Sequence, residues 1–110
     1  MSLRTINVGK DFHRAPAGRS FDDGPYSGEA FRKRVLIPAL EGPDVVVVEL
    51  DDTEGYGSSF LEEAFGGLVR EGRFTADQLK MKLRVTSSED PSLIEEIWTY
   101  IREARPKRVN

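Results

Sequence analysis

The sequence predicts an α/β fold, in which a small and mainly parallel or mixed sheet carries packed helices. Two observations lead to this prediction. Segments rich in strand-forming apolar residues alternate with segments whose apolar residues recur every three or four positions, as on one face of a helix. In addition, Val45–Leu50 contains four consecutive valines and lacks the polar alternation of a half-exposed strand, which is typical of a central parallel strand covered on both faces.

The chain before this central strand contains one predicted strand and one predicted helix. Thr5–Phe12 alternates well enough for a strand, although Gly9 weakens it. Arg14–Ser27 contains two prolines and two glycines, which predict turns rather than a helix. Ser27 is then a candidate helix cap, and Pro38 is expected to bend or tighten the last turn. The apolar stripe of this helix consists of Phe31, Val35, Leu36 and Leu40.

A second helix is predicted after the central strand and the loop that follows it. Its apolar face consists of Phe60, Leu61, Ala64, Phe65, Leu68 and Val69. Gly66 and Gly67 lower its helix propensity but permit close approach to the strand at Val45–Val48 or to another helix. Gly72 is placed to end the helix.

The last part of the chain predicts an edge strand followed by a third helix. Leu79–Thr86 alternates apolar residues with lysine and arginine, as a half-exposed edge strand does. Asp90 and Pro91 are typical of a helix start, and Pro106 of its end. The inward residues of this helix are expected to be Leu93, Ile94, Ile97, Trp98 and Ile101.

Length and composition limit the number of domains, the cellular compartment and the class of partner. The chain has 110 residues, which suits one domain and is too short for two ordinary ones, so residues 1–110 are interpreted as a single domain. The absence of cysteine excludes a disulfide framework and suits a reducing cytoplasm. No apolar segment is long enough to span a membrane or to serve as a signal core, so we expect a cytoplasmic protein without membrane contact. The net charge of −3 argues against nucleic acid as a partner.

The strand–loop–helix unit at Val45–Arg70 is the candidate functional site. Backbone N–H groups at a helix start are unpaired and point outward, so this loop could hold an anion or a partner protein. The candidate interaction or anion-binding loop comprises Gly55, Tyr56, Gly57, Ser58, Ser59, Phe60, Glu62 and Glu63. Ser58 is the better candidate for modification, because Ser59 and Glu62 have the spacing of a capping box that would occupy the Ser59 hydroxyl.

Two features of this loop have alternative interpretations. Tyr56 and Phe60 would be natural anchors for a partner if exposed, and Phe60 has an equal chance of belonging to the core. The acidic residues around the loop would repel a phosphate on Ser58 and could bind a basic partner or a divalent ion. They are Asp51, Asp52, Glu54, Glu62 and Glu63. A solvated helix start is favoured over a metal site, because no histidine joins these carboxylates.

Catalytic motifs are missing from the sequence. The single histidine is His13, which lies in or next to the first predicted strand, and neither Ser58 nor Ser59 is centred in a G-x-S-x-G elbow. The chain also lacks the Gly-Lys-Ser/Thr of a P-loop and the third glycine of a dinucleotide fingerprint. We therefore expect no enzyme, no catalytic residues, no metal and no cofactor.

Three segments resemble the bacterial STAS-like domain family of unknown function, whose members look like relatives of the anti-sigma-factor antagonists. They are GYGSSFLEEAFGGLVR at residues 55–70, Gly18-Arg19, and SGEAFR at residues 27–32. The resemblance implies a regulatory sheet-and-helix module without known chemistry. It also implies a protein partner, such as a histidine-kinase-like ATPase.

The same resemblance bears on Ser58. In the antagonists a partner kinase phosphorylates the first serine of an Asp-Ser-Ser-Gly segment, and Ser58 falls on that position. The flanking residues differ, because Gly57 and Phe60 stand where the antagonists have aspartate and glycine. The resemblance thus implies a regulatory interaction module with Ser58 as a candidate phosphorylation site. The alternative is a small-molecule or nucleotide-binding domain that uses the helix N-terminus at Ser58-Ser59.

Overall fold

Three parallel strands form the sheet of this α/β protein, as the computed structural model of the chain shows for residues 2–107. The strands lie in the order β1-β2-β3, with bounds Leu3–Asn7, Val45–Glu49 and Leu83–Thr86. The prediction of a small parallel sheet with packed helices is therefore confirmed. The Val45 strand is also the central one, because β2 pairs with β1 on one side and with β3 on the other.

Two long helices, each built from three consecutive segments, follow the first two strands. The first long helix consists of α2 (Gly28–Phe31), the π-helical turn η2 (Arg32–Leu36) and α3 (Ile37–Leu40). The second long helix consists of α4 (Ser58–Leu61), the π-helical turn η3 (Glu62–Gly66) and α5 (Gly67–Arg70). The shorter elements are α1 (Val8–Asp11), the 3₁₀ turn η1 (Phe21–Asp23) and α6 (Ala76–Lys82). The last helix is α7 (Ser92–Glu103), which begins and ends as predicted.

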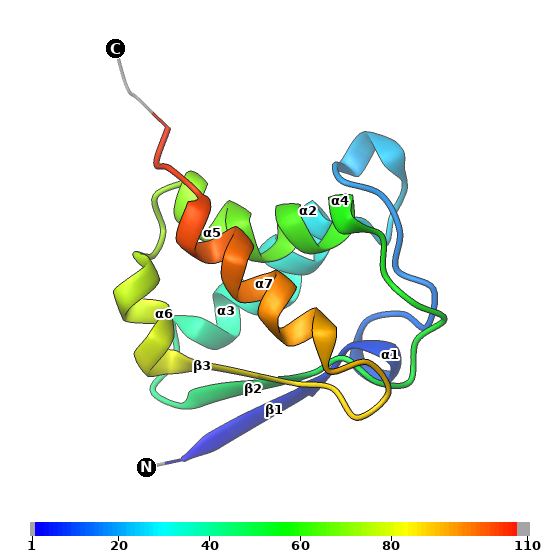
Figure 1. Ribbon diagram of the computed structural model, residues 1–110, viewed down its shortest axis with the longest axis horizontal. Coiled ribbons are helices and arrows are strands. Elements are labelled where there is room, and N and C mark those ends of the chain that lie inside the picture. Colours follow the sequence, from blue (N-terminus) through cyan, green and yellow to red (C-terminus); the bar gives the residue numbers. More distant parts are fainter. Residues whose placement is uncertain (1, 108–110) are drawn as a thin grey trace.

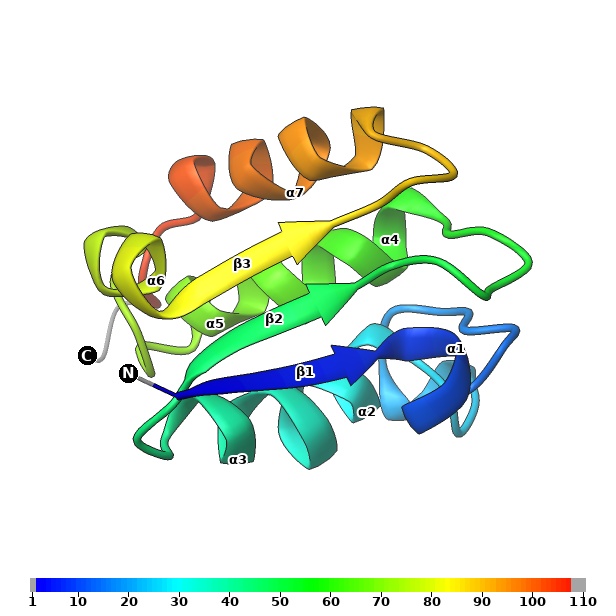
Figure 2. The ribbon, with the colours of Figure 1, turned by 90° about the horizontal axis from the view of Figure 1, so that it is seen from below.

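The two long helices and α7 lie on one face of the sheet, with the opposite face turned toward the viewer in Figure 2. Figure 1 shows the same arrangement from the side. The strand order follows the chain order, and right-handed crossovers of that kind place successive helices on the same face. The prediction that the central strand is covered on both faces is therefore wrong. On the open face Val47 is only partly buried, and its neighbours in register, Thr5 and Arg84, are exposed.

The first strand is shorter than predicted and ends at Asn7. The Asn7 side chain accepts a hydrogen bond from the backbone N–H of Lys10 (2.9 Å) and so caps the short helix α1. Gly9 is required inside that turn, because a Cβ there would collide with the backbone carbonyl of Asp52. Residues 8–12 are therefore a helical turn and its exit, not a continuation of the strand.

The predicted edge strand at Leu79–Thr86 is wrong in its first half. Residues up to Lys82 belong to α6, which begins with a capping box between Thr75 and Gln78. In that helix Leu79 is buried, whereas Met81 is 77% exposed although the strand pattern placed both on one face. Four residues remain as strand β3. The hydrogen bonds of the cap favour a helix here, although the apolar residues alternate as they do in a strand.

The first long helix begins where predicted, and its irregularity lies one turn earlier than predicted. Ser27 is its buried N-cap and accepts a hydrogen bond from the backbone N–H of Ala30 (3.2 Å). Pro38 lies in α3, but the widened π turn comes just before it, at η2. Proline lacks an N–H and crowds the carbonyl four residues earlier, which here is that of Arg34 in the π turn. In residues 2–107, no helix combines the length and the apolar character needed to cross a membrane.

Candidate interaction surface around Ser58

The candidate loop lies at the carboxyl end of the sheet. Because the three strands are parallel, the segments that follow Asn7, Glu49 and Thr86 emerge at the same edge. Open α/β sheets commonly bind their ligands at this edge. The second of these segments leads through Gly57 into the second long helix, so the structure places Ser58 where the sequence predicted it.

The second long helix begins two residues earlier than the predicted capping box requires. Its N-cap is Gly57, which has extended backbone angles (φ −81°, ψ 151°) and offers no side chain to the exposed N–H groups. Ser58 and Ser59 are the first two helical residues, and both are exposed. The capping box between Ser59 and Glu62 is therefore wrong. Neither serine hydroxyl is needed to cap this helix.

Phe60 is a core residue and not an exposed anchor. It is 1% exposed and packs against the rings of Phe31 and Tyr56, with ring centroids 6.0 and 5.7 Å apart. Tyr56 is half-buried, and its phenol donates a hydrogen bond to the carbonyl oxygen of Leu50 (2.7 Å). Burial raises the pKa of Tyr56 to about 12. Both rings therefore fix the loop to the end of the central strand.

The glycines of the loop leave its backbone open. A Cβ at Gly55 or at Gly57 would meet no atom within 4 Å. Gly55 has a φ of 123°, a conformation that side chains disfavour. The accessible part of the predicted site is thus Gly55, Gly57, Ser58 and Ser59.

Glu62 and Glu63 face an arginine cluster, which we call the arginine–glutamate network. It consists of Arg19, Arg32, Glu62, Glu63 and Arg70. Arg70 reaches Glu62 at 2.6 Å and Glu63 at 3.1 Å, while Arg32 reaches Glu63 at 2.6 Å. Arg19 pairs with both glutamates. The prediction that these two acids act as free negative charges around the loop is therefore wrong, because the three arginines neutralise them.

The network sets the protonation of Glu62. Burial alone would raise the pKa of this carboxyl, but hydrogen bonds and charge attraction from Arg70 and Arg19 outweigh burial. The pKa of Glu62 therefore lies below its ordinary value of 4.5. Glu62 stays ionised and paired at neutral pH.

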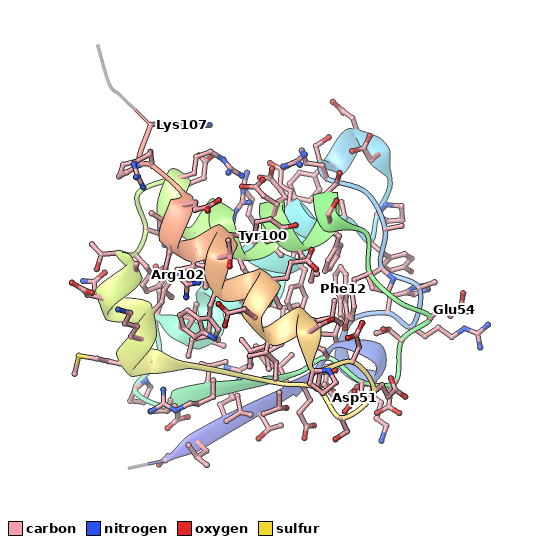
Figure 3. The ribbon with its side chains drawn as sticks, in the orientation of Figure 1. Phe12, Asp51, Glu54, Tyr100, Arg102 and Lys107 are labelled. Atoms are coloured by element: carbon pink, nitrogen blue, oxygen red, sulfur yellow. The ribbon has the colours of Figure 1, made fainter. Side chains whose placement is uncertain are left out.

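The other acids around the loop form hydrogen bonds with neighbouring segments. Asp51 accepts hydrogen bonds from the backbone N–H groups of Ser88 and Glu89 (both 3.0 Å), and these bonds lower its pKa. Figure 3 shows Asp51 beside the segment that follows β3, and Glu54 at the outer rim of the molecule. Asp52 accepts a hydrogen bond from the Asn7 side chain (2.8 Å).

The last carboxylate around the loop, that of Glu54, also has a partner. Glu54 pairs with Arg14 at 3.1 Å. Within residues 2–107, no group of three or more histidines and carboxylates has the arrangement of a metal site. The five acids are therefore structural partners of the loops and helices around them, rather than a free acidic surface.

Tyr100 is a neighbour of Ser58 that the sequence did not indicate, and Glu96 is the partner of Tyr100. The Tyr100 phenol donates a hydrogen bond to Glu96 (2.7 Å), and this bond together with burial raises the pKa of Tyr100 to about 12. The Ser58 hydroxyl lies beside the phenol and acts in the opposite direction. Both residues come from α7, and no local spacing could connect them with a loop some forty positions earlier.

His13 is part of the packing between loops. Its ring stacks on Tyr26 with centroids 3.7 Å apart, and its Nδ1 accepts a hydrogen bond from the backbone N–H of Ala15 (3.0 Å). The neighbouring Phe12, shown in the interior in Figure 3, contacts the Phe31 ring at 5.1 Å. His13 is therefore engaged with the irregular segment that precedes the first long helix.

The family comparison covers most of these elements. The model of the STAS-like domain of unknown function (DUF4325) matches residues 27–93, more than half of the chain. The matched part contains both long helices, the central strand and the loop with Ser58. Comparisons with curated proteins and with solved structures gave no match.

Proposed function

Because the chain belongs to the family of STAS-like domains of unknown function, we propose that it is a regulatory module that binds another protein through the Ser58 surface. We define the Ser58 surface as the accessible part of the loop and helix start, namely Gly55, Gly57, Ser58 and Ser59. The observation that carries the proposal is the position of Ser58. Its hydroxyl is exposed, is not used as a cap, and begins the helix that follows the central strand.

We further propose that phosphorylation of Ser58 switches this interaction. A phosphoserine carries about −1.5 to −2 charges at neutral pH, and a helix start favours negative charge. The arginine–glutamate network removes the main objection, since Glu62 and Glu63 are neutralised by arginines. A phosphate on Ser58 would also lie beside Tyr100, whose hydroxyl could donate to it in place of Glu96.

The proposed partner is a histidine-kinase-like ATPase, the class that the resemblance to anti-sigma-factor antagonists implies. A domain without catalytic groups needs its partner to supply the phosphoryl transfer. The gene beside that of this protein is the first place to look for such an ATPase.

Binding measurements with three variants test the proposal. Titration calorimetry against the neighbouring ATPase should show weaker binding for Ser58→Asp, because the added charge lies in the contact surface. Ser58→Ala should bind nearly as wild type. Ser2→Asp is the matched control, since it adds the same charge at an exposed serine outside the Ser58 surface and should bind as wild type. Equal affinities for wild type and all variants would remove Ser58 from the mechanism.

The alternative, a small-molecule or nucleotide-binding domain, receives less support at this edge. A cavity of about 350 Å³ lies beside the loop, but its lining includes Glu54, Glu89 and Asp90. Glu89 and Asp90 oppose a phosphate group there, whereas Glu54 is paired with Arg14. Thermal stabilisation of the isolated protein by a nucleotide would favour this alternative over protein binding.

A further inference from the structure

The outer edge of β3 borders a groove on the side of the molecule away from β1. The groove lies between β3, the end of α6 and α7, and has a volume of about 350 Å³. We call it the β3–α7 groove and define it by residues 83–86 together with Lys80, Trp98 and Arg102. Trp98 is only partly buried, so a large apolar surface lines one wall.

The strand register shows which backbone groups face this groove. Leu50 donates its backbone N–H to the carbonyl oxygen of Thr86 (2.9 Å), so Thr86 directs its backbone groups toward β2. The backbone N–H and C=O groups of alternate residues point to opposite edges of a strand. Those of Leu83 and Val85 therefore point toward the groove. In the described part of the chain, no residue pairs with the backbone N–H or C=O of Val85.

The carbonyl at the start of this edge has a charged partner. The guanidinium of Arg84 donates to the carbonyl oxygens of Leu83 and Lys80 (both 3.1 Å). Because the Leu83 N–H is bonded to the Leu79 carbonyl, both backbone groups of Leu83 are occupied, and Val85 is the residue of this edge whose backbone groups are unpaired among residues 2–107. Arg84 is the only charged side chain of β3, and it lies next to Val85 in the sequence.

The charge of the groove is positive. Lys80, Arg84 and Arg102 line it, and among residues 2–107 no carboxylate does. Two of these cations have exposed acidic partners outside the lining, Asp77 at 4.0 Å from Lys80 and Glu95 at 3.0 Å from Arg102. Exposed ion pairs are weak and exchange readily with other partners. Pairing with the β3 edge of a second copy is disfavoured, because it would bring like charges together.

We propose that the β3–α7 groove binds an extended acidic segment of a partner protein, which adds to the sheet as a strand beside β3. An unpaired strand edge, here at Val85, gives affinity through its backbone, while flanking side chains select the sequence. The cations select acidic side chains, and Trp98 accepts an apolar one. This site is distinct from the Ser58 surface. Figure 3 shows Tyr100, the neighbour of Ser58, and Arg102 of the groove on different sides of α7.

A defined peptide tests the proposal on the unmodified protein. The probe is a ten-residue peptide of alternating glutamate and valine, and the signal is the emission of Trp98, the only tryptophan of the chain. We expect saturable binding that weakens with salt. Replacing glutamate by lysine in the peptide, or valine by proline, should abolish binding, because the first change reverses the charge and the second prevents strand pairing. Equal binding of the proline peptide would overturn the proposal.

Amide hydrogen exchange identifies the edge that is used. The Val85 amide should exchange about tenfold more slowly, or slower still, when the acidic peptide is bound, because it gains a hydrogen bond. The Thr86 amide faces β2 and should change little. Slowing at residues of β1, or no slowing at Val85, would show that the peptide binds elsewhere.

A charge-reversal pair provides the matched control on the protein. Arg84→Glu should weaken peptide binding about tenfold, since an attraction is replaced by a repulsion of similar size. Arg4→Glu makes the same change in net charge on β1, the opposite edge strand, and should bind the peptide as wild type. Equal weakening by both variants would mean that only the overall charge matters and would contradict the proposal.

Discussion

The guanidinium of Arg32 occupies the space that a side chain at Gly67 would need. A Cβ built on Gly67 would lie 2.8 Å from Arg32 Cζ and still closer to Nη1. Arg32 is 1% exposed, and its Nη1 donates to the backbone carbonyl and the carboxylate of Glu63 (2.5 and 2.6 Å). The sequence predicted that this glycine permits close approach either to the central strand or to another helix, and the structure shows approach to another helix. The bare Gly67 admits a charged side chain from the first long helix.

Gly67→Ala should destabilise the protein, although alanine is normally the better helix former. We expect the free energy of unfolding to fall by about 1 to 3 kcal/mol, because the added methyl group displaces Arg32 from its carboxylate. Urea unfolding measures the change. Gly57→Ala is the control, since a Cβ there meets no atom within 4 Å. Equal stability of Gly67→Ala and wild type would show that the Arg32 side chain moves aside without loss.

Arg32→Met should be costly because it leaves Glu63 half-buried with one partner fewer. Removing one member of a buried ion pair typically costs about 3 kcal/mol or more. The double variant Arg32→Met/Glu63→Leu should lose less than the sum of the two single variants, since both charges are removed together. Additive losses in this cycle would mean that Arg32 and Glu63 do not stabilise each other.

Ser27→Ala and Ser58→Ala should differ although both serines lie at helix starts. Ser27 is buried and caps the first long helix, so its replacement should lower the free energy of unfolding by about 1 kcal/mol. Ser58 is exposed and follows the N-cap, so its replacement should change stability by less than about 0.5 kcal/mol. Thermal melts of the two variants side by side measure the difference. A large loss in Ser58→Ala would show that the hydroxyl is structural.

The depressed pKa of Glu62 predicts a loss of stability in acid. The unfolded chain binds a proton at Glu62 near pH 4.5, whereas the folded chain does so only at lower pH. The stabilisation is thus present above pH 4.5 and is lost as the pH falls through the folded-state pKa. Urea unfolding between about pH 7 and pH 3 should show a smaller loss in acid for Glu62→Gln than for wild type. Parallel pH profiles would contradict the role of Glu62.

The order of the main elements could be predicted from local patterns. The four valines of the central strand, the cap at Ser27 and the apolar stripe of α7 each act within about one element, and the structure confirms all three. The period of apolar residues and the chemistry of a cap are local properties, so they can be recognised without a fold. The position of Ser58 at a helix start after the central strand follows from the same patterns.

The tertiary structure decided which face of the sheet the helices cover and which arginines pair with Glu62 and Glu63. The Val45–Leu50 pattern could not show that one face of the sheet stays open, because that depends on the order of strands and the hand of the crossovers. Arg70 lies eight and seven positions after Glu62 and Glu63, a spacing that places all three on one face of a helix and that the sequence does contain. Arg19 and Arg32 lie 43 and 31 positions from the carboxylates they contact. The first long helix and the irregular segment before it pack against the second long helix and so bring these charges together. Attraction between side chains depends on distance in space and not on distance along the chain.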